Sequence, residues 1–196
     1  MTPRQQVQSA NHPAKGDIIT AEPLRTFEQV AEVKEYLSRH SLRDLALLTL
    51  GINTNLRASD IIRLTVSDVQ GNELLIREKK TGKIRRIPIN AAVKKALVRL
   101  PLADPSAPLF PSRKGSGFLT VPAVSRLVKK WCEDCGFKGD FSSHTLRKTW
   151  AFFQYYHFKT DLAEISNELN HSSLKMTYKY LGITPKSVEA MYAREI

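Results

Sequence analysis

Six arginine, lysine, histidine and tyrosine side chains along this chain are of the types that phosphoryl transfer requires. They are Arg57, Lys80, His144, Arg147, His171 and Tyr180. Guanidinium groups can stabilise the charge that builds on phosphate oxygens, because they stay charged and donate paired hydrogen bonds. A tyrosine hydroxyl can attack phosphorus if a base or a positive field activates it. A histidine can act as that base, and a lysine can protonate the leaving oxygen.

Each candidate also has an ordinary structural explanation. Arg57 could form a surface ion pair with Asp60, and the two histidines could simply cap helices. The acid and the nucleophile have competing neighbours of the same type, namely Lys79 and Lys83 for Lys80, and Tyr178 for Tyr180. No single residue decides the matter, so the ordered set has to carry the argument.

The hydrophobic pattern that must position these residues is mainly helical, with one interruption. Helices are predicted from a cap at Thr26 and from another at Thr120, where Pro122 suits the first turn. Other helical patterns cover residues 42–53, 59–66, 91–100, 143–157, 162–170, 173–181 and 185–194. Alternating patterns at 73–77 and 83–89 flank a turn at 79–82, which is typical of a β-hairpin. The expected fold class is therefore mainly α with a small antiparallel β-sheet (α+β).

Composition predicts a polyanionic partner. The 196 residues include 30 Lys and Arg against 19 Asp and Glu, which leaves a formal net charge of +11. Such an excess favours nucleic acid as the partner, although a solvated basic surface is the plainer alternative. We expect a mobile basic tail at 1–22, a catalytic domain at 23–183 and a terminal helix within 184–196. No stretch approaches the ~18 apolar residues of a membrane span, and no secretory signal is recognisable, so a cytoplasmic location is expected.

The two cysteines, Cys132 and Cys135, are spaced as in half a metal site or a redox pair. A zinc site would need two further ligands at suitable spacing. A thioredoxin-like pair should open a helix after a strand, whereas this pair closes a helical pattern. We therefore interpret the cysteines as structural thiols and expect no metal and no cofactor.

The ordered set resembles the tyrosine recombinase family, also called the phage integrase family, over about residues 25–182. The matching motifs are L-R-x-S-D at 56–60, K-T-G at 80–82, S-H-x-L-R-K-T at 143–149 and N-H-S-S-x-x-x-T-x-x-Y at 170–180. Asn170 departs from the glycine usual in the family, and Trp150 departs from the usual phenylalanine. Most members carry an N-terminal clamp domain, and we expect none within this sequence. The chain is therefore similar to short single-domain forms, or to a catalytic domain cut from a larger integrase.

This resemblance implies a role for each candidate. Arg57 and Arg147 would bind the scissile phosphate, and Tyr180 would attack it to form a 3′-phosphotyrosine. Of the other candidates, His144 would act as base, Lys80 as general acid and His171 as a hydrogen-bond donor to the phosphate, with Asp60 in support. The phosphotyrosine conserves the bond energy, so neither ATP nor a metal ion is required.

The resemblance also implies the partners. Double-stranded DNA would be bound through further basic residues, expected to be Lys83, Arg85, Arg86, Arg113, Lys114, Arg126, Lys129 and Lys130. The helix that begins near Pro185 would dock on a neighbouring subunit in a tetramer, or else on its own domain, and accessory DNA-bending proteins could assist. The expected function is site-specific recombination by integration, excision or inversion. The alternatives are a type IB topoisomerase-like enzyme and a non-catalytic DNA-binding regulator with the same fold.

Overall fold

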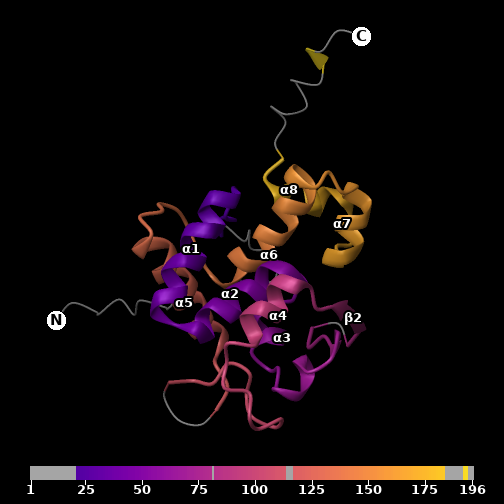
Figure 1. The fold of residues 1–196 in the computed structure, drawn as a ribbon. Coiled ribbons are helices and arrows are strands. Elements are labelled where there is room, and N and C mark those ends of the chain that lie inside the picture. The colour runs from indigo at the N-terminus through magenta and orange to yellow at the C-terminus, as the bar shows by residue number, and fades with distance from the viewer. Residues whose placement is uncertain (1–20, 81, 114–116, 184–191, 194–196) are drawn as a thin grey trace, which may run out of the picture.

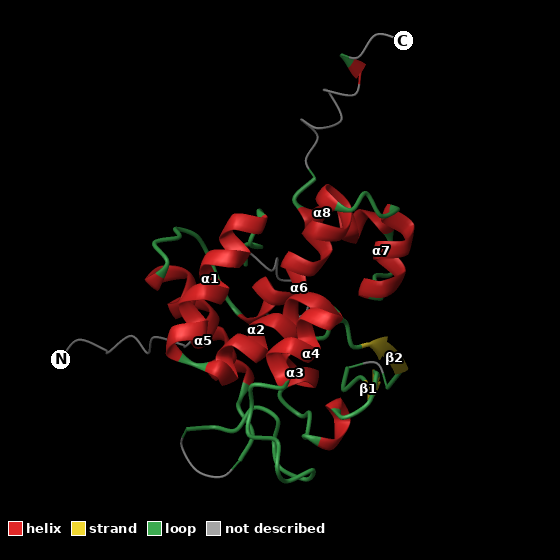
Figure 2. Cartoon of the chain, in the orientation of Figure 1, coloured by secondary structure: helices red, strands yellow, loops and turns green. Residues whose placement is uncertain are grey.

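The computed structural model describes residues 21–80, 82–113, 117–183 and 192–193. In this part of the chain, helices make up most of the fold and strands are confined to one hairpin (Figure 2). This arrangement confirms the expected α+β class. The expected tail at 1–22, the terminal helix and Lys114 fall largely or wholly outside the described residues.

A buried helix, α2 (Leu42–Thr54), lies at the centre of the fold (Figure 1). Most of its side chains are buried around the whole circumference, as expected for a helix covered on several sides. It contacts α1 (Phe27–His40), α4 (Ala91–Leu97) and α6 (Ser143–Phe152). Helix α5 (Val121–Asp134) packs against α1 and α6. The segments that carry Arg57, His144 and Arg147 therefore pack around this central helix.

Local sequence signals start several of these helices. The hydroxyl of Thr26 accepts a hydrogen bond from the Gln29 N–H at the start of α1, and Thr120 caps α5 in the same way. Helix α1 buries Val30, Val33 and Leu37, which recur at helical spacing in the sequence, whereas Phe27 at the start of the same pattern is 53% exposed. The periodic pattern at 143–157 forms α6 and then continues as a π-helical turn, η2 (Phe153–His157).

The hairpin consists of β1 (Glu73–Arg77) and β2 (Ile84–Pro88), paired antiparallel. Leu74 pairs with Ile87, and Ile76 pairs with Arg85, so these four residues share the face that is turned to the core. The predicted strands are thus confirmed, with β2 slightly shorter than expected. The loop between the strands carries Lys80 at an exposed position.

The predicted helix at 59–66 is wrong in extent, because α3 spans only Ala58–Ile61. The backbone then turns, passes Thr65 and leads into the short 3-10 helix η1 (Ser67–Val69). The Val66 N–H donates to the Ala107 carbonyl, and the Asp68 carboxylate accepts from the Thr65 N–H. These contacts compete with helical hydrogen bonds and end the helix early.

Two further helices, α7 (Leu162–Leu169) and α8 (Leu174–Leu181), form a small second layer against α6. They pack through their own apolar cluster, made by Ala151, Ile165, Leu169 and Leu181. Figure 1 shows this pair near the hairpin side of the molecule and away from α5. The layer carries the second half of the candidate site.

The cysteines lie at the end of α5, and both are free thiols. Cys132 is buried, and burial raises the pKa of its thiol to about 12. A thiol that stays protonated is a poor nucleophile and a poor ligand, which supports the structural interpretation. Among the described helices, none is both long enough and apolar enough to cross a membrane.

The close approach of α2 and α6 makes Gly51 a sensitive position. A Cβ atom at Gly51 would lie 2.7 Å from Cδ1 and 3.0 Å from Cβ of Leu146. We expect Gly51→Ala to lower the free energy of unfolding by about 1–2 kcal/mol in urea titrations, because overpacking outweighs the gain in helix propensity. Gly71→Ala is the matched control, since its Cβ would come no closer than 3.8 Å to another residue. Equal losses for the two variants would contradict this account of the helix contact.

Candidate active site

Arg57 stands at the N-terminal end of α3, and its side chain is only 19% exposed. Its Nη1 donates to Oε2 of Glu78 over 2.8 Å. Arg57 therefore pairs with Glu78 and does not form the surface ion pair with Asp60 that the sequence allowed. Asp60 is buried, and its Oδ1 instead accepts a hydrogen bond from the Lys79 N–H over 2.8 Å. The first turn of α3 thus contacts two consecutive residues at the base of the hairpin loop.

Helix α6 carries two of the candidates. Ser142 and Thr145 form a reciprocal capping box, which fixes where the helix begins. Burial lowers the pKa of His144 to about 4, and the nearby positive charges of Arg147, Lys148, Arg57 and Lys80 add to this effect. His144 is therefore neutral near pH 7.

Arg147 is buried with 5% of its surface exposed, which is unusual for a permanent charge. Its Nη2 donates to the Leu169 carbonyl over 2.8 Å, whereas Nη1 has no hydrogen-bond partner among the described residues. Burial lowers the pKa of Arg147 to about 10, so the group still carries its charge at neutral pH. The unpaired Nη1 is a donor available to a ligand.

The turn between α7 and α8 places His171 beside this arginine. Asn170 ends α7 with a φ of 53°, in the left-handed region that favours glycine and, after it, asparagine. The backbone conformation thus accounts for the departure at Asn170 from the glycine usual in the family. His171 Nδ1 lies 2.9 Å from Oγ1 of the fully buried Thr177. Burial, followed by the charges of Arg147 and Arg57, lowers the pKa of His171 to about 4.

Tyr180 extends from α8 toward the same arginines. Its hydroxyl is buried close to the Arg147 guanidinium, which tends to lower the pKa of the phenol, but the two groups form no well-aligned hydrogen bond. Burial raises the pKa of this phenol to about 12, while Arg147 and Arg57 act in the opposite direction. The ring meets His171 edge to face at a centroid distance of 5.2 Å, and Nζ of Lys148 lies 5.2 Å from the ring centroid. The competing Tyr178 is more exposed, at 43%.

The candidates from four separate segments therefore converge. Arg57 and Arg147 both act on Tyr180 and on the two histidines, and the charge of Lys80 reaches His144 from the hairpin. Positive charge, two neutral imidazoles and a protonated phenol share one region. Such a set can bind an anion and exchange protons beside it.

The basic residues expected to contact DNA differ in their surroundings. Arg85 is only 12% exposed, and it pairs with Glu78 at 3.3 Å and Glu168 at 2.6 Å, so its guanidinium is engaged within the protein. The other described members of the set are exposed, namely Lys83, Arg86, Arg113, Arg126, Lys129 and Lys130. Three of these also pair with acids, as Arg86 with Glu73, Lys129 with Glu133 and Lys130 with Asp134.

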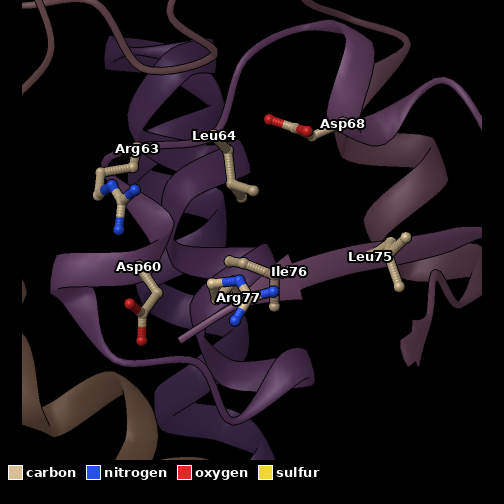
Figure 3. A pocket seen from close by; sticks show the side chains of 7 residues that line it. All are labelled: Asp60, Arg63, Leu64, Asp68, Leu75, Ile76 and Arg77. Atoms are coloured by element: carbon tan, nitrogen blue, oxygen red, sulfur yellow. The ribbon is translucent and has the colours of Figure 1, made fainter. Parts of the chain in front are cut away.

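A small hollow of about 180 Å³ lies between α3, η1 and β1 (Figure 3). Its lining consists of Asp60, Arg63, Leu64, Asp68, Leu75, Ile76 and Arg77. None of the six candidate catalytic residues lines it, and Asp60 alone links it to the site. The hollow is therefore not the place where the candidates meet.

Two residues of the site were not identified as candidates from the sequence. Glu78 is 2% exposed and bridges Arg57 and Arg85, and Thr177 contacts His171. A signal for Glu78 is present, since the alternation that turns Leu74 and Ile76 toward the core continues to residue 78 on the same side of the strand. Thr177 lies inside the last of the family motifs, although the motif alone gives it no role.

Comparisons with known proteins identify the family. The model of the phage integrase family matches residues 24–186. A probable integrase/recombinase of Bacillus subtilis, YoeC, is 35% identical over 173 residues, which cover 87% of this chain and 94% of that protein. The chain spans only about half the length of the recombinases named XerC that it matches.

Solved structures share the fold. The crystal structure of XerA recombinase superposes with a TM-score of 0.68 at 22% identity, over 89% of this chain and 65% of that one. The Tn1549 transposon integrase in complex with circular intermediate DNA gives 0.63 at 20% identity, over 88% of this chain and 64% of that one. With the family match and the relative in Bacillus subtilis, these findings establish that the chain belongs to the phage integrase family of tyrosine recombinases.

Proposed function

We propose that this chain recombines DNA at specific sites through a 3′-phosphotyrosine intermediate formed by Tyr180. The observation that supports this most directly is a pair of buried, unpartnered atoms, Nη1 of Arg147 and the Tyr180 hydroxyl, within a cluster of positive charge. Buried polar atoms are nearly always hydrogen-bonded in folded proteins, so two such atoms without partners in one basic cluster are suited to bind a ligand. A phosphodiester offers the acceptor oxygens and the negative charge that would match them.

In the proposed reaction, Arg57 and Arg147 hold the non-bridging oxygens and stabilise the charge that develops on them. The Tyr180 oxygen attacks phosphorus as the bond to the 5′ oxygen breaks, and Lys80 protonates that oxygen. His144 accepts the phenol proton. Rejoining reverses these transfers, because a free 5′ hydroxyl attacks the phosphotyrosine and the phenol leaves.

The depressed pKa of His144 fits this role once DNA is bound. A base with a pKa of about 4 is weak, yet it is neutral and can accept a proton. The negative charge of a phosphate in the same cluster would raise the pKa toward the working pH. His171 would donate a hydrogen bond from Nε2 to a phosphate oxygen, which requires that Thr177 satisfy Nδ1.

Double-stranded DNA is the proposed partner, supported by the net charge of +11 and by the DNA-bound transposon integrase that shares the fold. Exposed residues such as Arg113 and Arg126 would contact phosphates, whereas Arg85 would not. Assembly as a tetramer through residues 184–196, the aid of DNA-bending proteins and the choice among integration, excision and inversion stay predictions.

Covalent capture tests the proposal. A nicked suicide substrate built on a site mapped in the host genome should yield a protein–DNA adduct that is retarded in a denaturing gel. Tyr180→Phe should abolish the adduct, whereas Tyr178→Phe, the matched control on the same helix, should retain it. Lys80→Ala should slow adduct formation by roughly 10²- to 10⁴-fold.

Other outcomes would favour the alternatives. An adduct that persists in Tyr180→Phe would exclude this nucleophile. Binding without any adduct would indicate a regulator, and relaxation of supercoiled plasmid that lacks the site would indicate a topoisomerase.

Stability should fall on mild acidification, because two histidines are held neutral in the folded chain. In the unfolded chain a histidine takes up a proton near pH 6.5, whereas in the folded chain the pKa of His144 and of His171 is about 4. Between these values the unfolded state binds more protons, so the free energy of unfolding decreases from pH 7 toward pH 4. Urea titrations across this range should show that the free energy of unfolding depends less steeply on pH in His144→Gln and in His171→Gln than in the parent chain. Variants that keep the full slope would contradict the assignment.

The contact of Thr177 with His171 should set which imidazole nitrogen carries the proton. Thr177→Val keeps the shape but removes the hydroxyl, so the ring loses its partner at Nδ1 and cleavage should slow by about 10-fold. Nitrogen NMR shifts of His171 should report a changed mixture of the two neutral tautomers. Thr177→Ser, which restores a hydroxyl, should recover both properties. A Val variant that cleaves normally would show that the contact only packs.

A further inference from the structure

We propose that Glu78 is a positioning residue for strand cleavage, because its carboxylate ties Arg57 to the loop that carries Lys80. The arginine that binds the phosphate and the lysine that protonates the leaving oxygen would then be held as one unit. The inference rests on the proposed function, in which Lys80 is the general acid. It assigns a role to a buried acidic residue within a site that is mainly basic.

The carboxylate of Glu78 is engaged at both oxygens. Oε2 accepts from Nη1 of Arg57 at 2.8 Å, and Oε1 accepts from Nη1 of Arg85 at 3.3 Å. Arg85 in turn reaches Glu168 at the end of α7. With 2% of its surface exposed, Glu78 is deeply desolvated, and such a carboxylate is stable only when well paired. The two arginines therefore fix its position.

The backbone of Glu78 closes the loop that contains Lys80. Its N–H donates to the Lys83 carbonyl at 3.0 Å, and its carbonyl accepts from the Gly82 N–H at 2.9 Å. The next residue, Lys79, donates its N–H to the buried Asp60. A movement of the Glu78 side chain is thus passed through these hydrogen bonds to the loop, and Lys80 lies two residues from the anchor.

An alternative is that Glu78 competes with the phosphate and restrains the enzyme. The geometry favours positioning, because a guanidinium has five N–H donors and Glu78 engages Nη1 of Arg57. The same group can therefore hold the carboxylate on one edge and a phosphate on another. The charge of Glu78 also favours the positioning role. Burial lowers the pKa of Arg147, and Glu78 is among the groups that oppose this shift and so help Arg147 to stay charged.

The test compares Glu78→Gln with the parent chain on two suicide substrates. The Gln side chain keeps the size and one acceptor oxygen but removes the charge. We expect single-turnover cleavage of the ordinary substrate to slow by roughly 10- to 100-fold, as for a displaced catalytic group, while DNA affinity is unchanged. The second substrate carries sulfur in place of the bridging 5′ oxygen. A thiolate leaves without protonation, so a defect that arises from a misplaced acid should largely disappear.

Two variants calibrate the comparison. Lys80→Ala lacks the acid and should be rescued by the sulfur substrate. Glu168→Gln is the matched control, since Glu168 also pairs with Arg85 but is 58% exposed and makes no ion pair with Arg57. It should cleave both substrates at nearly the parent rate. If Glu78→Gln melts below the assay temperature, Glu78→Asp replaces it, because it keeps the charge and shortens the link by one methylene group.

The outcomes separate the inference from the function on which it rests. Rescue of both Lys80→Ala and the Glu78 variant by sulfur supports the inference. Rescue of Lys80→Ala alone overturns the inference and leaves the proposed function intact. Failure to rescue Lys80→Ala overturns both the assigned acid and the role of Glu78. Faster or unchanged cleavage of the ordinary substrate by Glu78→Gln also overturns the inference about Glu78. Faster cleavage would show that Glu78 restrains the site.

Discussion

The interior of this domain has to hold arginine charge away from water, and the architecture of the site follows from that constraint. A buried guanidinium is costly unless its donors are satisfied by oxygen atoms that the fold supplies. Arg147 donates a hydrogen bond to the Leu169 carbonyl, and Arg57 donates one to the Glu78 carboxylate. Each partner comes from a distant part of the chain. Satisfying the arginines therefore brings α3, the hairpin, α6 and α7 together.

The end of α7 serves several of these needs at once. Its last carbonyls lie at the negative end of the helix dipole, which favours positive partners. The Glu168 carbonyl accepts from the Asn55 side chain at the end of α2, and the Leu169 carbonyl accepts from Arg147. Asn55 and Asn170 both adopt left-handed backbone conformations, with φ of 55° and 53°. Two sharp turns thus present a helix terminus to the site without a long loop.

Sequence patterns predicted most of the elements because the signals were local. Thr26 and Thr120 cap helices where the patterns begin, and alternation predicted both strands of the hairpin. The prediction failed at residues 62–66, where the backbone bonds to residues about forty positions later. No local pattern encodes such a partner.

The site likewise combines features that local sequence predicts with contacts that depend on distant residues. The resemblance indicated six residues. In the fold, Arg57 and Arg147 influence both histidines and Tyr180, and Lys80 influences His144. The pairing of Arg57 with Glu78, rather than with the nearby Asp60, depends on how the hairpin docks. The pairing of Arg85 with Glu78 and Glu168 depends on the same docking, and the sequence pattern of basic residues did not predict it. What sequence alone could not give was the set of charges that neutralise the arginines.

The buried phenol of Tyr180 has a consequence for the timing of the proposed reaction. Burial raises the pKa of this phenol to about 12, so the hydroxyl keeps its proton at neutral pH. In the proposed reaction this proton must therefore leave during the attack on phosphorus, and not before DNA is bound. The proposed enzyme would then hold no standing phenolate between one DNA contact and the next.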